Sequence, residues 1–310
     1  MIDHRLTTLR AFASCGTIAA TAELTGYSPS AVSAQLRELQ NSLGMRLLVK
    51  EGRGLQLTSA GRSLVLRSDA LVAEWERIKA TAMSESGEAP TDFGLGGFST
   101  AASNLLVPLA ADMRRTRPEV RVHVAEASPS RCLELLAAER IDLAVVVATE
   151  AEASLGSDAR FQETTLLNDP LDVMIPADHE HAGRESISLT ELAGEAWISD
   201  AVGTPYRSLF AAAFTAVGVT PRVEHEATEW ETATALVGAG MGLGLIPRLA
   251  SLGGAENVTR LPISGLGRPT RRIVATIRRG TEGAPLIADS LGFLRTTARR
   301  LLSERLDEST

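Results

Sequence analysis

Residues 17–44 (TIAATAELTGYSPSAVSAQLRELQNSLG) constrain the fold most strongly, because they predict two short helices joined by a tight turn. Ser28 is a favourable N-cap residue, and Pro29 occupies the first helical position, where its missing N–H costs no hydrogen bond. Gly44 can adopt the left-handed backbone conformation that ends a helix. The sequence therefore predicts a second helix over residues 29–43.

This second helix has one apolar face and one polar face. Its apolar positions recur at spacings typical of a buried helical stripe: Val32, Leu36, Leu39 and Leu43. The opposite face and its flank carry short side chains, one Arg and one amide instead of the usual mixture of Glu, Lys and Asp. These residues are Ser30, Ser33, Ala34, Arg37 and Asn41. Short side chains let a helix approach base edges, Arg pairs with guanine, and Asn pairs with adenine. The polar face therefore predicts a DNA recognition helix, although an αα-hairpin in a small helical core would give the same apolar stripe.

Charge is distributed unevenly along the 310 residues, whose net charge is −7. Residues 1–67 hold eight Lys/Arg and four Asp/Glu, a net charge of +4, so the remaining residues carry −11. A basic N-terminal module on an acidic body fits a DNA-binding head attached to a domain with another task.

The residues that follow the predicted recognition helix indicate a β-hairpin. Short apolar strands over 47–49 and 55–57 flank a Gly52-Arg53-Gly54 turn. Lys50 and Arg53 would then reach phosphates or the minor groove, whereas a surface hairpin with incidental charges is the alternative. The predicted DNA-binding residues are Ser28, Ser30, Ser33, Ala34, Arg37, Asn41, Lys50 and Arg53.

A long helix is predicted over residues 59–86, with Glu74 and Arg77 paired one turn apart. One narrow seam repeats on it in heptad fashion: Leu64, Ser68, Leu71, Trp75, Ile78 and Ala82. Such a seam predicts pairing with a second copy, in a homodimer or homotetramer, while packing against its own hairpin is the alternative. Two paired heads could read two half-sites about one DNA turn apart.

The N-terminal third resembles the LysR-type transcriptional regulators. The resemblance rests on LRAFASCGTIAATAE, SPSAVSAQLRELQ and the hairpin that ends in LTSAG. It implies a winged helix-turn-helix, a long linker helix and a larger effector-binding domain. Thr25 stands where the family usually has Leu, Ala34 where it often has a basic or amide residue, and Leu48 and Lys50 replace a common Phe and Arg. None of these departures removes a glycine, a helix cap or the apolar stripe.

The rest of the chain alternates strand and helix patterns, with apolar strands that favour a parallel sheet covered on both faces, an α/β fold. Pro108 predicts a kink in one helix, and a Ser188-Leu-Thr-Glu191 capping box predicts a short one. Two lobes resemble the periplasmic-binding-protein-like sensor of the same family. The expected domains are a winged helix-turn-helix at 1–58, a linker and dimerisation helix at 59–88, and an effector-binding domain at 91–310, with lobe 1 at about 91–167 and 268–310 and lobe 2 at about 168–267.

Hydroxyl and carboxyl side chains follow several predicted strands of these lobes. Ligands of parallel α/β sheets bind beyond the carboxyl ends of the strands, where helix N-termini favour anions. The predicted effector-binding residues are Ser99, Thr100, Ser128, Ser199, Asp200 and Thr228. They suggest a carboxylate ligand, and Asp200 suggests that the ligand also carries an amine. For each residue taken singly, a helix cap without a ligand is the alternative.

Other function classes find less support in the sequence. GAGMGLG at 238–244 follows a predicted helix and precedes a strand, the reverse of a dinucleotide fingerprint. His179 and His181 stand in a polar loop without further metal ligands nearby in sequence, and no nucleophile motif is present, so neither catalytic residues, a cofactor nor a metal is expected. The start MIDHRLTTLR lacks an apolar signal region, so we expect a cytoplasmic protein without membrane contact, with Cys15 and Cys132 reduced.

The sequence therefore predicts a transcriptional regulator that binds double-stranded promoter DNA and a small-molecule effector, and no enzyme. A solute-binding protein or an enzyme with a helical N-terminal extension is one alternative. A scaffold that uses the long helix for partner binding is another.

Overall fold

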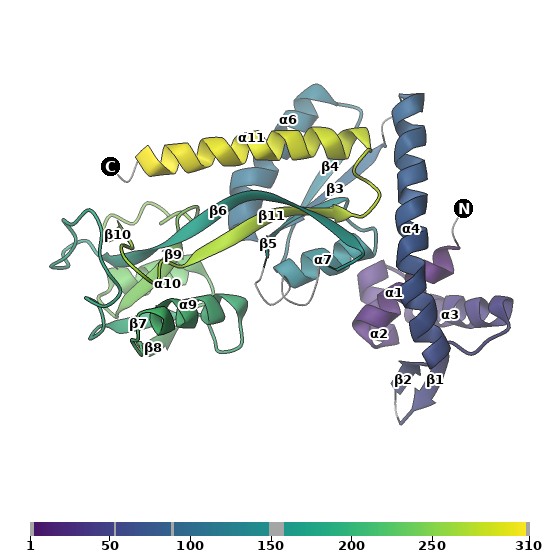
Figure 1. Cartoon of the computed structure of the whole chain (residues 1–310), viewed down its shortest axis with the longest axis horizontal. Helices are drawn as coiled ribbons and strands as arrows, with labels where there is room; N and C mark the ends of the chain where they lie inside the picture. The colour runs from purple at the N-terminus through teal and green to yellow at the C-terminus, as the bar shows by residue number, and fades with distance from the viewer. Residues whose placement is uncertain (1–2, 53, 88–89, 149–157, 308–310) are drawn as a thin grey trace. The chain divides into compact units, whose positions relative to one another are not determined.

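The N-terminal helices begin and end where the caps and glycines predict (Figure 1). The computed structural model describes residues 3–52, 54–87, 90–148 and 158–307, without the side chains of 302–307. Helices α1 (His4–Cys15), α2 (Ile18–Thr25) and α3 (Pro29–Leu43) each end at a glycine with positive φ. The side chain before each helix accepts a backbone N–H from its first turn, so local chemistry accounts for these boundaries.

The three helices enclose a small apolar core, completed by a two-stranded wing. Buried members of this core come from every helix of the head: Leu6, Leu9, Phe12, Ala22, Val32, Leu36 and Leu39. Strands β1 (Leu48–Glu51) and β2 (Gly54–Leu57) pair antiparallel as the predicted hairpin. Leu43, predicted to complete the buried stripe, is instead 42% exposed, because it lies in the last turn of α3, beyond the reach of the core.

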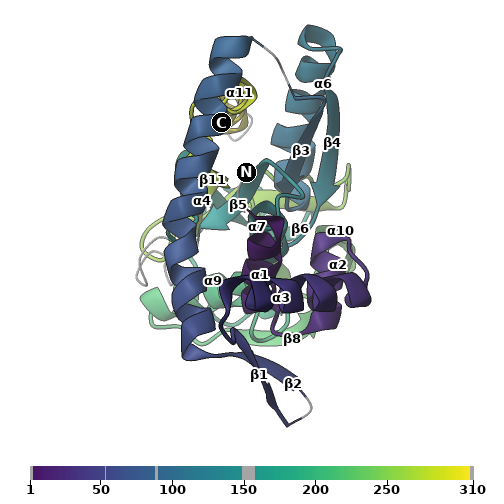
Figure 2. The same cartoon turned by 90° about the vertical axis from the view of Figure 1, so that its right-hand side faces the viewer.

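Helix α4 (Ser59–Ser86) has the predicted length, and Figure 2 shows α1 to α3 gathered beside its N-terminal half. Its buried positions fall mainly one turn apart: Gly61, Ser68, Val72, Ala73, Glu76 and Ala80. The predicted heptad seam is only partly on this face, since Leu71 and Ile78 are 56% and 52% exposed. The predicted pairing of Glu74 with Arg77 is confirmed.

Contacts between residues gather the chain into two compact units. The first unit holds the described residues up to 146 with 158–165 and 274–296, and the second holds 147–148, 166–273 and 297–307. Within the described residues, we find no helix that combines the length and the apolar character needed to span a bilayer.

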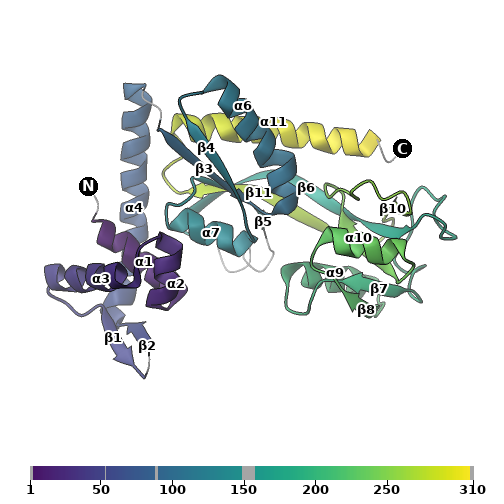
Figure 3. The same ribbon diagram turned by 180° about the vertical axis from the view of Figure 1, so that it is seen from behind.

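In the first unit, β3 (Asp92–Gly97) pairs in parallel with both β4 (Arg121–Glu126) and β5 (Leu143–Ala148). Strand β11 (Thr270–Arg278) follows β5 in the sheet order. Figures 1 and 3 show α6 (Val107–Thr116) and α11 (Pro285–Asp307) on one side of these strands and α7 (Pro129–Ala137) on the other.

Just before Pro108, where a kink is predicted, the helix changes type. Helix α5 (Ser99–Ala101) continues into a π-helix, η1 (Ala102–Leu106), before α6 begins. Proline has no N–H to donate to the carbonyl one turn earlier, so the regular α-helical ladder cannot run through this point.

The second unit is built on a mixed sheet in the order β6-β9-β7-β8, with β10 paired to β6. Parallel pairs join β7 (Ala196–Ser199) to β8 (Arg222–Glu226) and to β9 (Leu243–Pro247). Strand β6 (Phe161–Pro176) instead pairs antiparallel with β9 and with β10 (Val258–Pro262). The prediction of a parallel sheet is therefore wrong for β6 and β10, because apolar strand composition does not specify strand direction.

Alternate residues of these strands pack against two different helices. Trp197 lies in a cluster with Phe210 and Phe214 of α9 (Pro205–Ala216), whereas its neighbour Ile198 packs with Val237 of α10 (Trp230–Gly238). The two helices thus cover opposite faces of the sheet.

The helix predicted at Ser188 does not form. The capping-box contact is present, since Ser188 N–H donates to Glu191 Oε2 at 3.0 Å, but only turns follow it. Leu189 and Leu192 are fully buried, so packing on the sheet stabilises this segment as turns.

Candidate nucleic-acid interface and ligand site

Helix α3 presents the predicted polar face to solvent. Leu36 and Leu39 are each 3% exposed, while Ser30, Ala34, Arg37 and Asn41 are all exposed. Ser33 lies between these extremes. The orientation predicted from residue spacing is therefore confirmed.

The polar side chains of this face differ in how they are already engaged. The Ser28 hydroxyl accepts from Ala31 N–H at 3.2 Å, and Ser33 donates to the Pro29 carbonyl at 2.9 Å. Within the described part of the chain, the side chains of Arg37 and Asn41 make no intramolecular hydrogen bond or ion pair. The donors and acceptors of Arg37 and Asn41 are thus free for an external partner. The hydroxyls of Ser28 and Ser33 already bond the backbone of α3.

Gln40 fixes the wing to the recognition helix. Its Oε1 accepts the N–H groups of Leu47 and Leu48, at 3.0 and 3.1 Å. Sequence reasoning missed this residue, since nothing in its neighbourhood shows that its amide would bond the wing strand.

The structure describes one of the two basic wing residues that were predicted to contact DNA. Lys50 is exposed on β1, as is Arg46 in the turn between α3 and β1. Arg53, a predicted DNA-binding residue, lies outside the described residues. Arg46 is a further candidate phosphate contact that the sequence could have suggested, because it lies two residues after the helix-ending Gly44 and just before the wing.

Three of the predicted effector-binding residues belong to the first unit. Thr100 is buried at 4% exposure in α5, whereas Ser99 is exposed. The Ser128 hydroxyl caps α7 and accepts from Arg131 N–H at 3.3 Å. Ser128 is therefore a helix cap, the alternative that its sequence position also allowed.

The other three belong to the second unit, where parallel pairing of β7 with β8 brings them together. Thr228 donates to Asp200 Oδ1 at 3.1 Å, and the same oxygen accepts from Ala201 N–H at 2.7 Å. The Ser199 hydroxyl is buried and has no hydrogen-bond partner among the described residues. Asp200 therefore organises its own loop, whereas Ser199 offers an unused donor.

Arg207 is a candidate that sequence reasoning missed. Its guanidinium lies beside the same loop and donates to the Asp200 carbonyl at 3.2 Å, while also lying 5.7 Å from the Phe210 ring centroid. It stands in the first turn of α9, a position where a basic residue is unusual, and this was the available signal.

The fold thus combines a winged helix-turn-helix with an α/β domain of two lobes, the architecture of a ligand-responsive DNA-binding regulator. The family described as LysR substrate binding domain matches residues 90–299, and the family of bacterial regulatory helix-turn-helix proteins, lysR family, matches residues 4–62. The chain therefore belongs to the LysR family of transcriptional regulators.

One curated relative agrees with this assignment, and two solved structures share the fold. A hydrogen peroxide-inducible genes activator from Dickeya chrysanthemi is 30% identical over 227 residues, covering 72% of this chain and 71% of that protein. Full-length OxyR from Pseudomonas aeruginosa has a similar structure, with a TM-score of 0.66 at 18% identity over 96% of this chain and 95% of that one. Full-length CbnR in complex with its target DNA has a TM-score of 0.57 at 17% identity, over 96% of this chain and 100% of that one.

Proposed function

We propose that this regulator reads promoter DNA through the exposed face of α3 and senses a small carboxylate or amino-acid-like metabolite in its α/β domain. The observation that carries the first half is the exposed, acid-poor set of Ser30, Ala34, Arg37 and Asn41, together with the exposed cations Arg46 and Lys50. Arg37 and Asn41 match the hydrogen-bonding edges of guanine and adenine in the major groove. We assign residues 1–58 to this DNA-binding domain and place the protein in the cytoplasm.

A second copy of the chain would complete the DNA-binding unit. Leu71 and Ile78 are exposed apolar side chains on one side of α4, and Trp75 between them is partly exposed. Pairing of two such helices, over the linker at 59–88, would bury this seam and set two heads on successive half-sites.

The ligand half of the proposal rests on polar groups at the carboxyl ends of strands. In the second unit, Thr228 and the Arg207 guanidinium both donate to Asp200, and the preceding residue, Ser199, has a buried hydroxyl without a hydrogen-bond partner among the described residues. Hydroxyl and guanidinium donors of this kind match the hydrogen bonds of a carboxylate. The proposed effector-binding residues of the first unit, within 91–310, are Ser99, Thr100 and Ser128. In the second unit Asp200 shapes the loop.

The name of the Dickeya relative raises peroxide sensing as another possibility. A peroxide-reactive cysteine needs thiolate character and exposure. Burial raises the pKa of the Cys132 thiol to about 11, and burial together with the negative charge of Glu134 raises that of Cys15. Of the two cysteines, Cys132 is buried and Cys15 is partly exposed, and the raised pKa of each disfavours the thiolate. A bound metabolite is therefore the better-supported signal.

Arg37→Ala tests the DNA half. We expect binding to the promoter region beside its own coding sequence to weaken by about 1–3 kcal/mol, because one bidentate base contact is lost. Lys50→Ala should instead weaken binding to all DNA sequences. It should also reduce the slope of log K against log salt concentration by about one, the contribution of one phosphate contact. Fluorescence anisotropy at several salt concentrations measures both effects.

Arg121→Ala is the matched control, since Arg121 is an exposed arginine of lobe 1 paired with Asp92. An Arg37→Ala protein that binds the promoter as tightly as this control would contradict the assignment of α3 to the groove.

A further inference from the structure

The DNA-binding head has a second apolar surface, separate from its own core. Ala11 of α1 and Leu24 of α2 are 6% and 1% exposed, and both are buried in a cluster with Ala138, which directly follows α7. Cys15 and Leu135 pack against the same cluster. Lobe 1 therefore buries apolar side chains of the head that would otherwise contact water.

Polar contacts surround this cluster. Gly26, at the end of α2, lies so close to Arg140 that a Cβ at this position would overlap the guanidinium. Glu23 of α2 lies 3.9 Å from Arg131 of α7. The surface thus has an apolar centre and a charged edge, as interfaces between protein parts commonly do.

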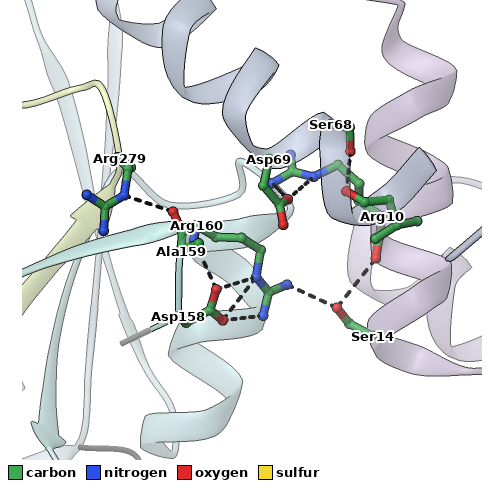
Figure 4. A network of polar contacts seen from close by, with 9 residues as sticks. Arg10, Ser14, Ser68, Asp69, Asp158, Ala159, Arg160 and Arg279 are labelled. Atoms are coloured by element: carbon green, nitrogen blue, oxygen red, sulfur yellow. Dashed lines mark hydrogen bonds and ion pairs between the residues drawn. The ribbon is translucent and has the colours of Figure 1, made fainter. Parts of the chain in front are cut away.

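A four-charge cluster joins the head, the linker helix and lobe 1 (Figure 4). Arg10 of α1 pairs with Asp69 of α4 at 3.0 Å, and Arg160, next to β6, pairs with Asp158 at 2.6 Å. Arg160 also donates to the Ser14 hydroxyl of α1 at 3.2 Å. Burial alone would raise the pKa of Asp158, but hydrogen bonds from Arg160 and the field of Arg10 outweigh it and lower that pKa.

These charges balance one another, so the cluster has a structural role. Arg10 and Arg160 each have a carboxylate partner, and Arg278 on the same side of α4 pairs with Asp142 at 3.0 Å. An anion bound here would compete with these partners. The cluster is suited to hold three segments of the chain together.

We propose that the head docks on lobe 1 of its own chain through this surface, and that docking sets the direction in which the recognition helix is presented. The groove-facing residues of α3 remain exposed in the docked state, so docking is compatible with DNA binding. A movement of lobe 1 would carry the head with it. This second half rests on the proposed function, whereas docking itself does not.

The two cysteines provide a built-in reporter of docking. Cys15 lies on the docked surface, where burial and Glu134 of α7 raise its pKa. If the head separates, the influence of Glu134 is lost and Cys15 becomes less buried. Cys132 is fully buried inside lobe 1 and reports whether the lobe is folded.

The first experiment follows the reaction of full-length protein with 5,5′-dithiobis(2-nitrobenzoate) at pH 8. Ala138→Glu places a charge in the apolar centre and should raise the Cys15 rate about ten-fold or more, while Arg160→Ala should raise it less. Arg121→Ala is the matched arginine control and should react like the wild type. Cys132 should react only after denaturation in every variant. A wild-type Cys15 rate equal to that of Ala138→Glu, with Cys132 still protected, would overturn docking.

The second experiment measures the bend of promoter DNA by circular-permutation gel shift. Ala138→Glu should keep its half-site recognition but change the bend angle, and an unchanged angle would overturn the orienting role. Arg37→Ala should keep the slow Cys15 rate while losing DNA affinity. Normal DNA binding by Arg37→Ala would thus count against the proposed function and leave docking standing.

Discussion

Two buried side chains of similar size, Ser199 and Cys132, have different consequences for the protein. The Ser199 hydroxyl has no hydrogen-bond partner among the described residues, and leaving a polar group in that state costs about 1–3 kcal/mol. The Cys132 thiol is a weak donor and lies 3.6 Å from the Ala127 carbonyl, so its burial costs little. The first residue is a candidate for ligand binding, and the second contributes to the lobe's core.

We expect Ser199→Ala to leave the free energy of unfolding unchanged or to raise it by about 1 kcal/mol, because an unbonded polar group is removed. Urea denaturation of the unliganded protein measures this. A loss of stability greater than that of an ordinary surface substitution would show that the hydroxyl is bonded within the fold.

Ligand binding provides a second test of Ser199. A thermal-shift screen of amino acids and small organic acids should identify stabilising acids, and calorimetry with such an acid should show weaker binding to Ser199→Ala and Thr100→Val. DNA binding by the unliganded variants should stay at the wild-type value. Undiminished affinity in Thr100→Val would remove that residue from the site.

Alkaline pH should destabilise the first unit through Cys132. Its pKa rises from 9.0 to about 11 on folding, so the folded state holds the proton more tightly and stability falls as pH rises above 9. Between pH 9 and 10 this thiol should cost about 1 kcal/mol. In Cys132→Ala that part of the pH dependence should vanish, as urea unfolding at each pH would show. Parallel pH profiles for the two proteins would contradict a buried thiol.

Helix α4 has one buried side and one exposed apolar side. Ser68, Val72, Glu76 and Ala80 bury one side within the chain, whereas Leu71 and Ile78 leave an apolar side in solvent. The buried side is held closely, because Gly280 in the turn after β11 lies against the Ala73 carbonyl. A helix held in this way is an integral part of the first unit.

Gly280→Ala should therefore destabilise the protein by about 2 kcal/mol or more, since φ is +97° and the added Cβ would overlap the carbonyl of α4. Gly283→Ala is a matched control three residues away, where a Cβ would meet open space, and its effect should be small. Thermal unfolding compares the two, and equal melting temperatures would argue against close packing of the turn on α4.

At the scale of the whole molecule, the exposed seam of α4 predicts assembly. The double substitution Leu71→Glu and Ile78→Glu should shift the protein towards monomers by placing like charges where two helices meet. Analytical ultracentrifugation measures the shift. Leu66→Glu is the control, because Leu66 is 75% exposed on α4 but lies off the seam. Wild-type association of the double variant would show that another surface joins the copies.

The sequence by itself determined the elements of the head and their boundaries. Ser28, Pro29 and Gly44 set the limits of α3 through hydrogen bonds and φ angles within a few residues, and residue spacing predicted which side of the helix is buried. Caps, glycine conformations and side-chain periodicity depend on neighbours along the chain, so they can be deduced without knowing the fold.

Tertiary structure decided the features whose partners come from distant segments. Antiparallel pairing of β6 with β10, the bonds from Gln40 to the wing, and the place of Arg207 beside Asp200 all depend on which segments meet in space. The contact of Arg160 with Ser14 joins residues far apart in the chain, and no local pattern marks either one. The local sequence of a strand is compatible with either strand direction, and a charged side chain can pair with any suitable partner. The packing of the whole unit therefore decides both.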